Sequence, residues 1–271
     1  MNLCHALLVF GLAAGFATSA EDWTPLNSDR PGHTFSSSTA NSGALLLESE
    51  FDWNPKKDLA DEFSIPILLR YGVTDRLEVN AGSSIFFEPT VQRSSAFEVG
   101  ARFQWFQGDR FKANLHGRFQ LAYPSSDARL AVSWLGTNFT FIDGKWSTNL
   151  SVFGYHLNPK GFERRDYEPY TDMSFVLNFK YQANEKWSGY IDYALSEFWY
   201  SPPFLSQELY YFKGVSWVCA RLINPNLQID VAADIPFNFG FSAGKVYVLV
   251  EYISLGATWR IIPGNSNSTT K

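Results

Sequence analysis

FSIPILLRYGVTDRLEVNAGSSIFF, residues 63–87, is the stretch that decides the fold. On both sides of its central GVTDR the odd-numbered positions are mostly apolar, whereas the even-numbered positions include Arg70 and Glu78. Because the side chains of a β-strand point alternately to its two faces, this pattern predicts a β-hairpin with one apolar face and one charged face. The rest of the chain repeats this unit.

The same alternation begins at Gly43 and continues to residue 262. It predicts about twelve strands of roughly ten residues or more. Strands of globular proteins have about five or six residues, whereas transmembrane barrel strands need about nine to eleven. The further segments are 96–106, 111–123, 145–157, 172–182, 186–199, 208–223, 226–237 and 246–262.

Two segments interrupt the regular pattern. Between Trp134 and Gly136 the apolar positions change from even to odd numbers, which predicts a β-bulge at Gly136. In residues 208–223 the letters YYFKGVSWVCARLI fit either face, so the phase of that strand stays open.

The connections between the segments alternate in length. The second, fourth, sixth, eighth and tenth segments are followed by short turns at 72–76, 107–110, 143–145, 183–186 and 224–226. The odd-numbered segments are mostly followed by longer loops, at 54–61, 88–95, 158–171, 200–207 and 238–245, with 124–127 the shortest. In an up-and-down meander, all short turns then lie at one end, as in outer-membrane barrels with short periplasmic turns.

Aromatic residues flank the short turns. Trp and Tyr prefer the boundary between membrane and water, because they combine an apolar ring with a polar edge. These residues therefore predict a girdle at the short-turn end of the barrel. They are Tyr71, Trp105, Phe111, Phe141, Trp146, Tyr181 and Trp187.

Alternation alone does not say which face points outward, since a soluble β-sandwich or lipocalin-like barrel alternates too. A barrel of about twelve strands is too wide for side chains to fill, whereas small soluble barrels have about eight strands. The strand lengths and the aromatic strand ends also match a bilayer. The sequence therefore predicts an all-β fold, a transmembrane up-and-down antiparallel β-barrel of about twelve strands, within a range of about ten to fourteen. A soluble β protein with its apolar face inward is the alternative.

The two ends of the chain differ from the barrel pattern. Residues 1–20, MNLCHALLVFGLAAGFATSA, are apolar and end in small residues, which predicts a cleaved secretory signal peptide rather than a buried N-terminal segment. Residues 21–42 are polar and irregular, and form either a plug or a periplasmic tail; residues 43–262 form the barrel and residues 263–271 a tail. Removal of the signal leaves Cys219 as the one cysteine, which excludes an internal disulfide.

Composition excludes several functions. The net charge is −5 with acids and bases interspersed, which argues against a nucleic-acid partner. No phosphate-binding glycine loop or metal-spaced cluster is present, so no cofactor or metal is expected. Beyond the signal, the histidines are His33, His116 and His156. None lies in a nucleophile motif, so we expect no enzymatic activity, a barrel hydrolase being the alternative.

The polar face supplies the candidate functional residues. The inward positions carry eight acids, Glu48, Glu50, Asp52, Glu78, Glu98, Asp192, Asp230 and Asp234, and six bases, Arg70, Arg102, Lys112, Arg118, Arg129 and Lys180. Such a mixed lining suits a weakly selective pore or a lumen cross-linked by ion pairs, and the sequence leaves both open. The candidates for lining the lumen or belonging to a plug are Asp29, Arg30, Glu48, Glu50, Arg70, Glu78, Glu98, Arg102, Lys112, His116 and Arg118.

Arg30 precedes Pro31 in the irregular segment, which has no strand partner of its own. If residues 21–42 fold into the barrel, Arg30 must find a carboxylate, because a buried charge needs a partner. The candidate partners are Glu48, Glu50 and Glu78. The alternative is a solvated periplasmic tail.

Three motifs in the first third of the mature chain resemble one known family. They are Asp29-Arg30-Pro31, then Gly43 and Glu48 within GALLLESE, and LLRYGVTDRLEV over residues 68–79. Together they resemble the outer-membrane transporter-like family labelled "meta-pathway of phenol degradation". The resemblance implies an outer-membrane barrel linked to the uptake of aromatic compounds.

The last strand resembles another known signal. Ser254, Gly256, Trp259 and Ile261 follow the spacing that outer-membrane assembly machinery recognises in the final strand of bacterial barrels. The expected partners are therefore outer-membrane lipid and that machinery, and the expected location is the bacterial outer membrane.

We thus expect a channel or transporter for the passive passage of small solutes, aromatic or hydrophobic ones included. The alternative is a closed structural or surface-interaction barrel with a filled lumen.

Overall fold

The computed structural model describes residues 26, 37–54, 61–87, 97–121, 129–160, 170–197, 212–236 and 252–262. Within these residues all regular structure is β-strand. The strands are β1 (Leu45–Asn54), β2 (Glu62–Gly72), β3 (Leu77–Phe87), β4 (Phe97–Gln107), β5 (Phe111–Leu121), β6 (Arg129–Asp143), β7 (Trp146–Lys160), β8 (Tyr170–Gln182), β9 (Trp187–Glu197), β10 (Phe212–Asn224), β11 (Leu227–Pro236) and β12 (Tyr252–Ile262).

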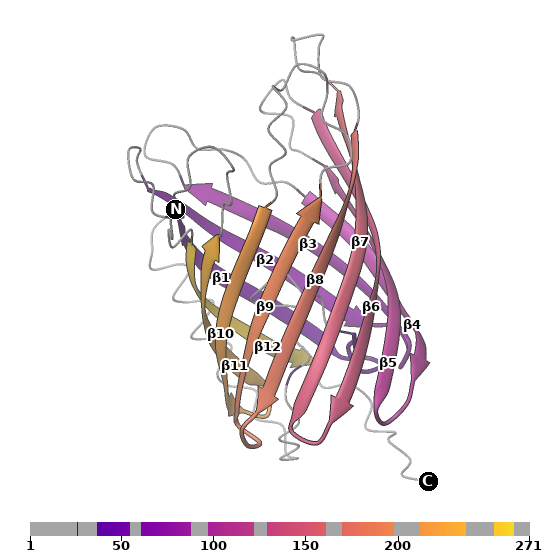
Figure 1. The fold of residues 1–271 in the computed structure, drawn as a ribbon, viewed down its shortest axis with the longest axis vertical. Coiled ribbons are helices and arrows are strands. Elements are labelled where there is room, and N and C mark those ends of the chain that lie inside the picture. The colour runs from indigo at the N-terminus through magenta and orange to yellow at the C-terminus, as the bar shows by residue number, and fades with distance from the viewer. Residues whose placement is uncertain are drawn as a thin grey trace.

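The twelve strands form one closed antiparallel barrel (Figure 1). Each strand pairs with its neighbours in the sequence, and β1 pairs with β12 to close the sheet, with Glu48 opposite Thr258. Closure leaves no sheet edge with unpaired backbone groups, which is what a sheet needs in order to stand in lipid. The predicted fold class and strand number are confirmed.

The two faces of the barrel wall have opposite character. Leu69, Val79 and Phe103 are more than two fifths exposed on the outer wall, whereas the neighbouring Arg70, Glu78 and Arg102 are buried inside. This is the reverse of a soluble barrel, in which the apolar face fills the centre. The predicted orientation, with the apolar face outward, is confirmed.

All five turns between the even-numbered strands and the strands that follow them lie at one end, the lower end in Figure 1. Side-chain oxygens stabilise several of them. Thr74 Oγ1 accepts hydrogen bonds from the backbone N–H groups of Arg76 and Leu77, and Asn184 Oδ1 does the same for Lys186 and Trp187. Such local bonds favour tight turns. The longer connections lie outside the described residues, apart from Asp61.

The predicted aromatic girdle surrounds this short-turn end, and all seven of its side chains are exposed on the outer wall. Several pack against one another. The Trp146 and Tyr181 ring centroids are 4.6 Å apart, and Trp105 and Phe139 meet edge to face at 6.4 Å. Arg221 lies over the Trp187 ring at 5.0 Å, a cation–π contact.

The predicted bulge at Gly136 is wrong. Strand β6 pairs without interruption with β5 and β7, and Gly136 stands opposite His116 in that unbroken register. The change of parity arises because the half-buried Trp134 takes an inward position, which a wide lumen tolerates. One register shift lies instead between Phe103 and Phe106 in the β4–β5 pairing.

The structure also settles the phase of β10. Trp217, Cys219 and Arg221 point outward and are exposed, whereas Ser216 and Val218 are buried on the inner wall. No helix within the described residues is both long and apolar enough to cross a membrane. The predicted signal peptide and the C-terminal tail lie outside the described residues.

Candidate functional site

A buried ion network joins the first strands at the short-turn end of the lumen. Arg70 of β2 donates from Nη1 to Glu48 Oε1 at 2.8 Å, and from Nε and Nη2 to both oxygens of Glu78 at 2.9 and 2.7 Å. Arg102 Nη1 of β4 lies 3.6 Å from Glu78 Oε1. A guanidinium fork matches a carboxylate in this two-point manner, which compensates for the loss of water around both charges.

The described end of the N-terminal segment enters this network from inside the barrel. We call residues 37–42 the plug segment; Ser37, Ser38, Thr39 and Ala40 in it are buried. The Ala40 N–H donates to Glu78 Oε2 at 2.7 Å. The Ser38 carbonyl accepts from Arg102 Nη1 at 3.2 Å and from Arg70 Nη2 at 3.5 Å. Neutral main-chain groups thus complete the bonding of buried charged side chains.

The plug segment joins the barrel wall at Gly72, the last residue of β2. Ser42 and Gly72 form a parallel bridge, and the Gly43 N–H donates to the Gly72 carbonyl at 2.7 Å. A Cβ atom at Gly72 would come within 2.1 Å of the Asn41 carbonyl oxygen and 2.5 Å of that of Ala40. Only a glycine allows the plug segment to pass so close to the wall.

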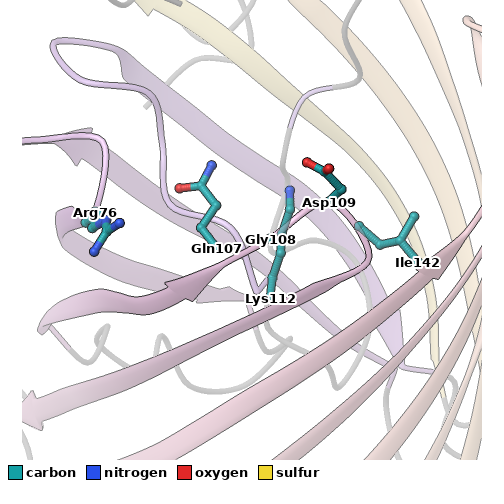
Figure 2. A pocket seen from close by; sticks show the side chains of 6 residues that line it. All are labelled: Arg76, Gln107, Gly108, Asp109, Lys112 and Ile142. Carbon is teal, nitrogen blue, oxygen red and sulfur yellow. The ribbon is translucent and has the colours of Figure 1, made fainter. Parts of the chain in front are cut away.

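Lys112 of β5 connects the plug segment with an open cavity. Its Nζ atom donates to Ser38 Oγ at 3.2 Å. The cavity has a volume of about 470 Å³ and lies at the turns β2–β3 and β4–β5. Figure 2 shows Lys112 between Gln107 and Asp109, with Arg76 and Ile142 on either side. The residues that line it are Arg76, Gln107, Gly108, Asp109, Lys112 and Ile142.

Lys180 of β8 is a second lysine of the inner wall, and its exposure is intermediate. Among the residues that the structure describes, neither lysine forms an ion pair with an acid, since the ion pairs there involve other bases.

Neutral polar side chains line much of the remaining wall. Asn138 Nδ2 donates to Asn114 Oδ1 at 2.8 Å and lies 3.1 Å from His116 Nδ1. Thr140 donates to Asn149 at 3.1 Å. Farther from the short turns, Arg118 pairs with Glu98 at 3.2 Å, and Asn178 donates to Asp192.

An apolar strip interrupts this polar lining on β10 and its neighbour. Val218, Ala220 and Leu222 follow each other on the inner face of β10, and Ala232 stands opposite Val218 on β11. All four are buried. The inner wall thus carries charged side chains on β1–β5 and several apolar ones on β10 and β11, and these apolar side chains are closed off from solvent.

Most of the residues predicted to line the lumen do lie on the inner wall. Glu48, Arg70, Glu78, Arg102 and His116 are buried there, and Lys112 and Arg118 are partly buried. Glu50 and Glu98 have intermediate exposure. Asp29 and Arg30 lie outside the described residues, so the proposed pairing of Arg30 stays a prediction, and so do the inward positions of the Arg129 and Asp234 side chains.

Sequence reasoning missed the role of Ser38 and the apolar strip. A carbonyl and a hydroxyl in a serine-rich stretch carry no pattern that singles them out. The strip lies in the segment whose phase the sequence left open.

The histidines that the structure describes do not build a catalytic arrangement. His116 belongs to the Asn114 and Asn138 network, and His156 is exposed on β7. Within the described ranges, no group of three His, Cys, Asp or Glu side chains is placed to hold a metal ion. The absence of enzymatic activity stays a prediction.

The chain was compared with known proteins. No protein-family model and no curated protein matches it, so the resemblance in residues 29–79 is not confirmed. Solved porin structures do match. The NanC porin is 9% identical and has a TM-score of 0.58, with 79% of this chain and 98% of that chain covered. An outer membrane channel from Pseudomonas putida F1 is 11% identical and has a TM-score of 0.58, with 85% and 100% covered. At such identities the likeness shows the fold alone.

Proposed function

We propose that this protein is a bacterial outer-membrane channel through which small solutes pass passively. The observation that carries this proposal is the inverted wall of the barrel. Exposed apolar side chains such as Leu69 and Phe103 suit lipid, and a polar interior suits solutes that move in water. The shared fold with solved porins supports the same reading.

The proposal includes export and orientation. Residues 1–20 direct the chain across the inner membrane and are cleaved, and the barrel assembly machinery inserts it into the outer membrane, where lipid surrounds it. The short-turn end, with its girdle and the plug segment, then faces the periplasm.

The solutes of this channel are small compounds with an aromatic or otherwise apolar part. The resemblance of Asp29-Arg30-Pro31 and residues 68–79 to a family linked to the uptake of aromatic compounds supports this choice.

A closed structural barrel is the second candidate function, and the plug segment favours it. Two of its buried residues, Ser38 and Ala40, form hydrogen bonds to Arg102, Lys112 and Glu78, which narrows the short-turn end.

Recording from planar bilayers that contain the purified protein distinguishes these functions. We expect stepwise conductance increases from the folded barrel and none from protein that was boiled beforehand. If the protein gives no conductance although it still migrates as a compact band on a gel without boiling, the channel function is contradicted and the closed barrel is supported.

A further inference from the structure

We propose that Arg221 binds the phosphate group of an anionic phospholipid in the leaflet that surrounds the short-turn end of the barrel. The site lies on the outer wall, so it is separate from the lumen and from the plug segment. It requires that lipid covers the outer wall, and it exists whether or not solutes pass through the lumen.

The outer wall carries almost no charge. Among the outward strand positions whose side chains the structure describes, two are occupied by a lysine, arginine, aspartate or glutamate: Arg221 on β10, and Asp143, the last residue of β6. Arg221 is exposed and lies three residues before the end of β10. A charge on a wall that faces lipid costs free energy unless a polar group reaches it.

The protein itself offers Arg221 little compensation. Its Cζ atom lies 5.0 Å from the centroid of the Trp187 ring, and the two residues stand opposite each other on β10 and β9. Within the described part of the chain, the Arg221 side chain forms no ion pair and no hydrogen bond. Its guanidinium N–H groups are therefore available to an acceptor outside the protein.

A lipid phosphate is the acceptor that matches this position. Trp187 belongs to the aromatic girdle, and such girdles lie at the level of the lipid headgroups. A guanidinium binds phosphate through two parallel N–H bonds, more strongly than it binds a neutral acceptor. The exposed turn before Trp187 carries Glu185 and Lys186, whose charges cancel. Arg221 thus gives the site a net positive charge, which favours an anionic lipid over a zwitterionic one.

The wall beside Arg221 also has room for an acyl chain. Gly189 and Cys219 stand opposite each other, one outward position farther from the short turns. A Cβ atom at Gly189 would meet one atom within 4 Å, a backbone carbonyl oxygen at 3.4 Å, so little covers this glycine. The exposed side chains of Trp217 and Val231 border the same place. An acyl chain below a phosphate at Arg221 would lie over the two small residues and against these apolar ones.

The first test uses the unmodified barrel, so it does not depend on the folding of a variant. The full barrel in detergent micelles is mixed with dioleoylphosphatidylglycerol, with dioleoylglycerol, which has the same chains but no phosphate, or with inorganic phosphate. The temperature at which half of the protein loses its compact gel band is recorded, because a ligand that binds the folded state raises this midpoint. We expect dioleoylphosphatidylglycerol alone to raise it. An equal rise with dioleoylglycerol or inorganic phosphate would overturn the phospholipid site.

Two variants then locate the bound lipid. Arg221→Gln removes the charge and keeps a polar side chain, and Lys145→Gln is the control, because Lys145 is an exposed cation at the same end of the barrel. We expect Arg221→Gln to weaken the apparent affinity for dioleoylphosphatidylglycerol at least about tenfold, the loss of one charged hydrogen bond, and Lys145→Gln to leave it unchanged. Equal affinities in the two variants would refute the site, since a general attraction to basic groups would then explain the binding.

A purely structural role of Arg221 predicts a different result. Loss of the contact with Trp187 alone would lower the midpoint equally with and without dioleoylphosphatidylglycerol, whereas loss of the lipid site removes the increase that the lipid causes. A lower midpoint with the full increase still present in Arg221→Gln would therefore refute the phosphate site. None of these measurements depends on conductance, so a failure of the proposed channel function and a failure of the lipid site are distinguishable.

Discussion

Arg70 and Glu78, which belong to neighbouring strands of one hairpin, face each other inside the barrel through two hydrogen bonds of 2.9 and 2.7 Å, and both side chains are fully buried. Glu78 also accepts the Ala40 N–H at 2.7 Å. The carboxylate of Glu78 thus links its own strand, β3, to β2 and to the plug segment. Changes at this position should therefore affect the stability of the barrel and the position of the plug segment together.

Replacing Glu78 with Gln should lower the stability of the barrel markedly. The change leaves Arg70 without its two-point partner, and breaking a buried pair costs about 3–5 kcal/mol. Glu98→Gln is the matched control, because Glu98 is 17% exposed and meets Arg118 through a single contact at 3.2 Å; it should cost about 1–2 kcal/mol. The stability of each variant is measured as the temperature at which half of the protein no longer migrates as a compact band on a gel. Equal midpoints for the two variants would contradict the central role of Glu78.

Replacing Gly72 with Ala should open the short-turn end. The added Cβ meets backbone oxygens of Asn41 and Ala40, which cannot rotate away as a side chain can, so the plug segment must shift. Gly189→Ala is the control, because its Cβ would lie at 3.4 Å from the nearest atom, an ordinary contact. We expect a larger single-channel conductance for Gly72→Ala and an unchanged one for Gly189→Ala. The same conductance in both variants would show that the plug segment does not limit the pore.

A charged residue on the outer wall should destabilise the barrel in a bilayer, because its charge then lies in lipid. Leu135 is 70% exposed near the middle of β6, and an Arg at such a depth costs about 2–4 kcal/mol. Leu135→Ala loses apolar area without adding a charge and should cost less. Urea unfolding in phospholipid vesicles, followed by tryptophan fluorescence, measures the difference. A similar cost for Arg and Ala would mean that lipid does not cover this wall.

Cys219 should report the orientation of β10. It is exposed on the outer wall beside Trp217, whereas Ala220 is buried on the inner wall. In a chain with Cys4 replaced by Ser, a fluorophore on Cys219 should be quenched by lipids that carry nitroxide-labelled chains. The same label on Ala220→Cys, with Cys219 also replaced by Ser, should be protected. Strong quenching from both positions would contradict the assigned phase of the strand.

Alternation allowed the strands and their outward faces to be predicted, since each charged residue such as Glu78 or Arg102 has apolar neighbours on both sides. It failed where one residue breaks the rule for a local reason. Trp134 fits an inward position because the lumen is wide, and Arg221 fits an outward one because it lies over the Trp187 ring near the membrane boundary. Neither reason is visible before the strands are placed.

The candidate site was less predictable than the wall. The sequence identified the inward charges but not their partners, because the pairing of Arg70 with Glu78 depends on the offset between β2 and β3, in which Arg70 stands opposite Asn80. The bonds to Ser38 depend on main-chain atoms, which every residue possesses. Contacts of that kind follow from the path of the chain, and the composition of residues 37–42 does not encode them.

The short distance between the plug segment and the barrel has a further effect. Ser42 is followed by Gly43, whose φ of 76° turns the chain, and β1 begins at Leu45. Because this connection is so short, the plug segment stays near its binding site even after it has dissociated from the wall. Its effective concentration there is about a millimolar or more. The plug segment therefore rebinds to the wall rapidly, at a rate that does not depend on the cellular concentration of the protein. A free peptide with the sequence of the plug segment would have to reach a similar concentration to compete for the same binding site.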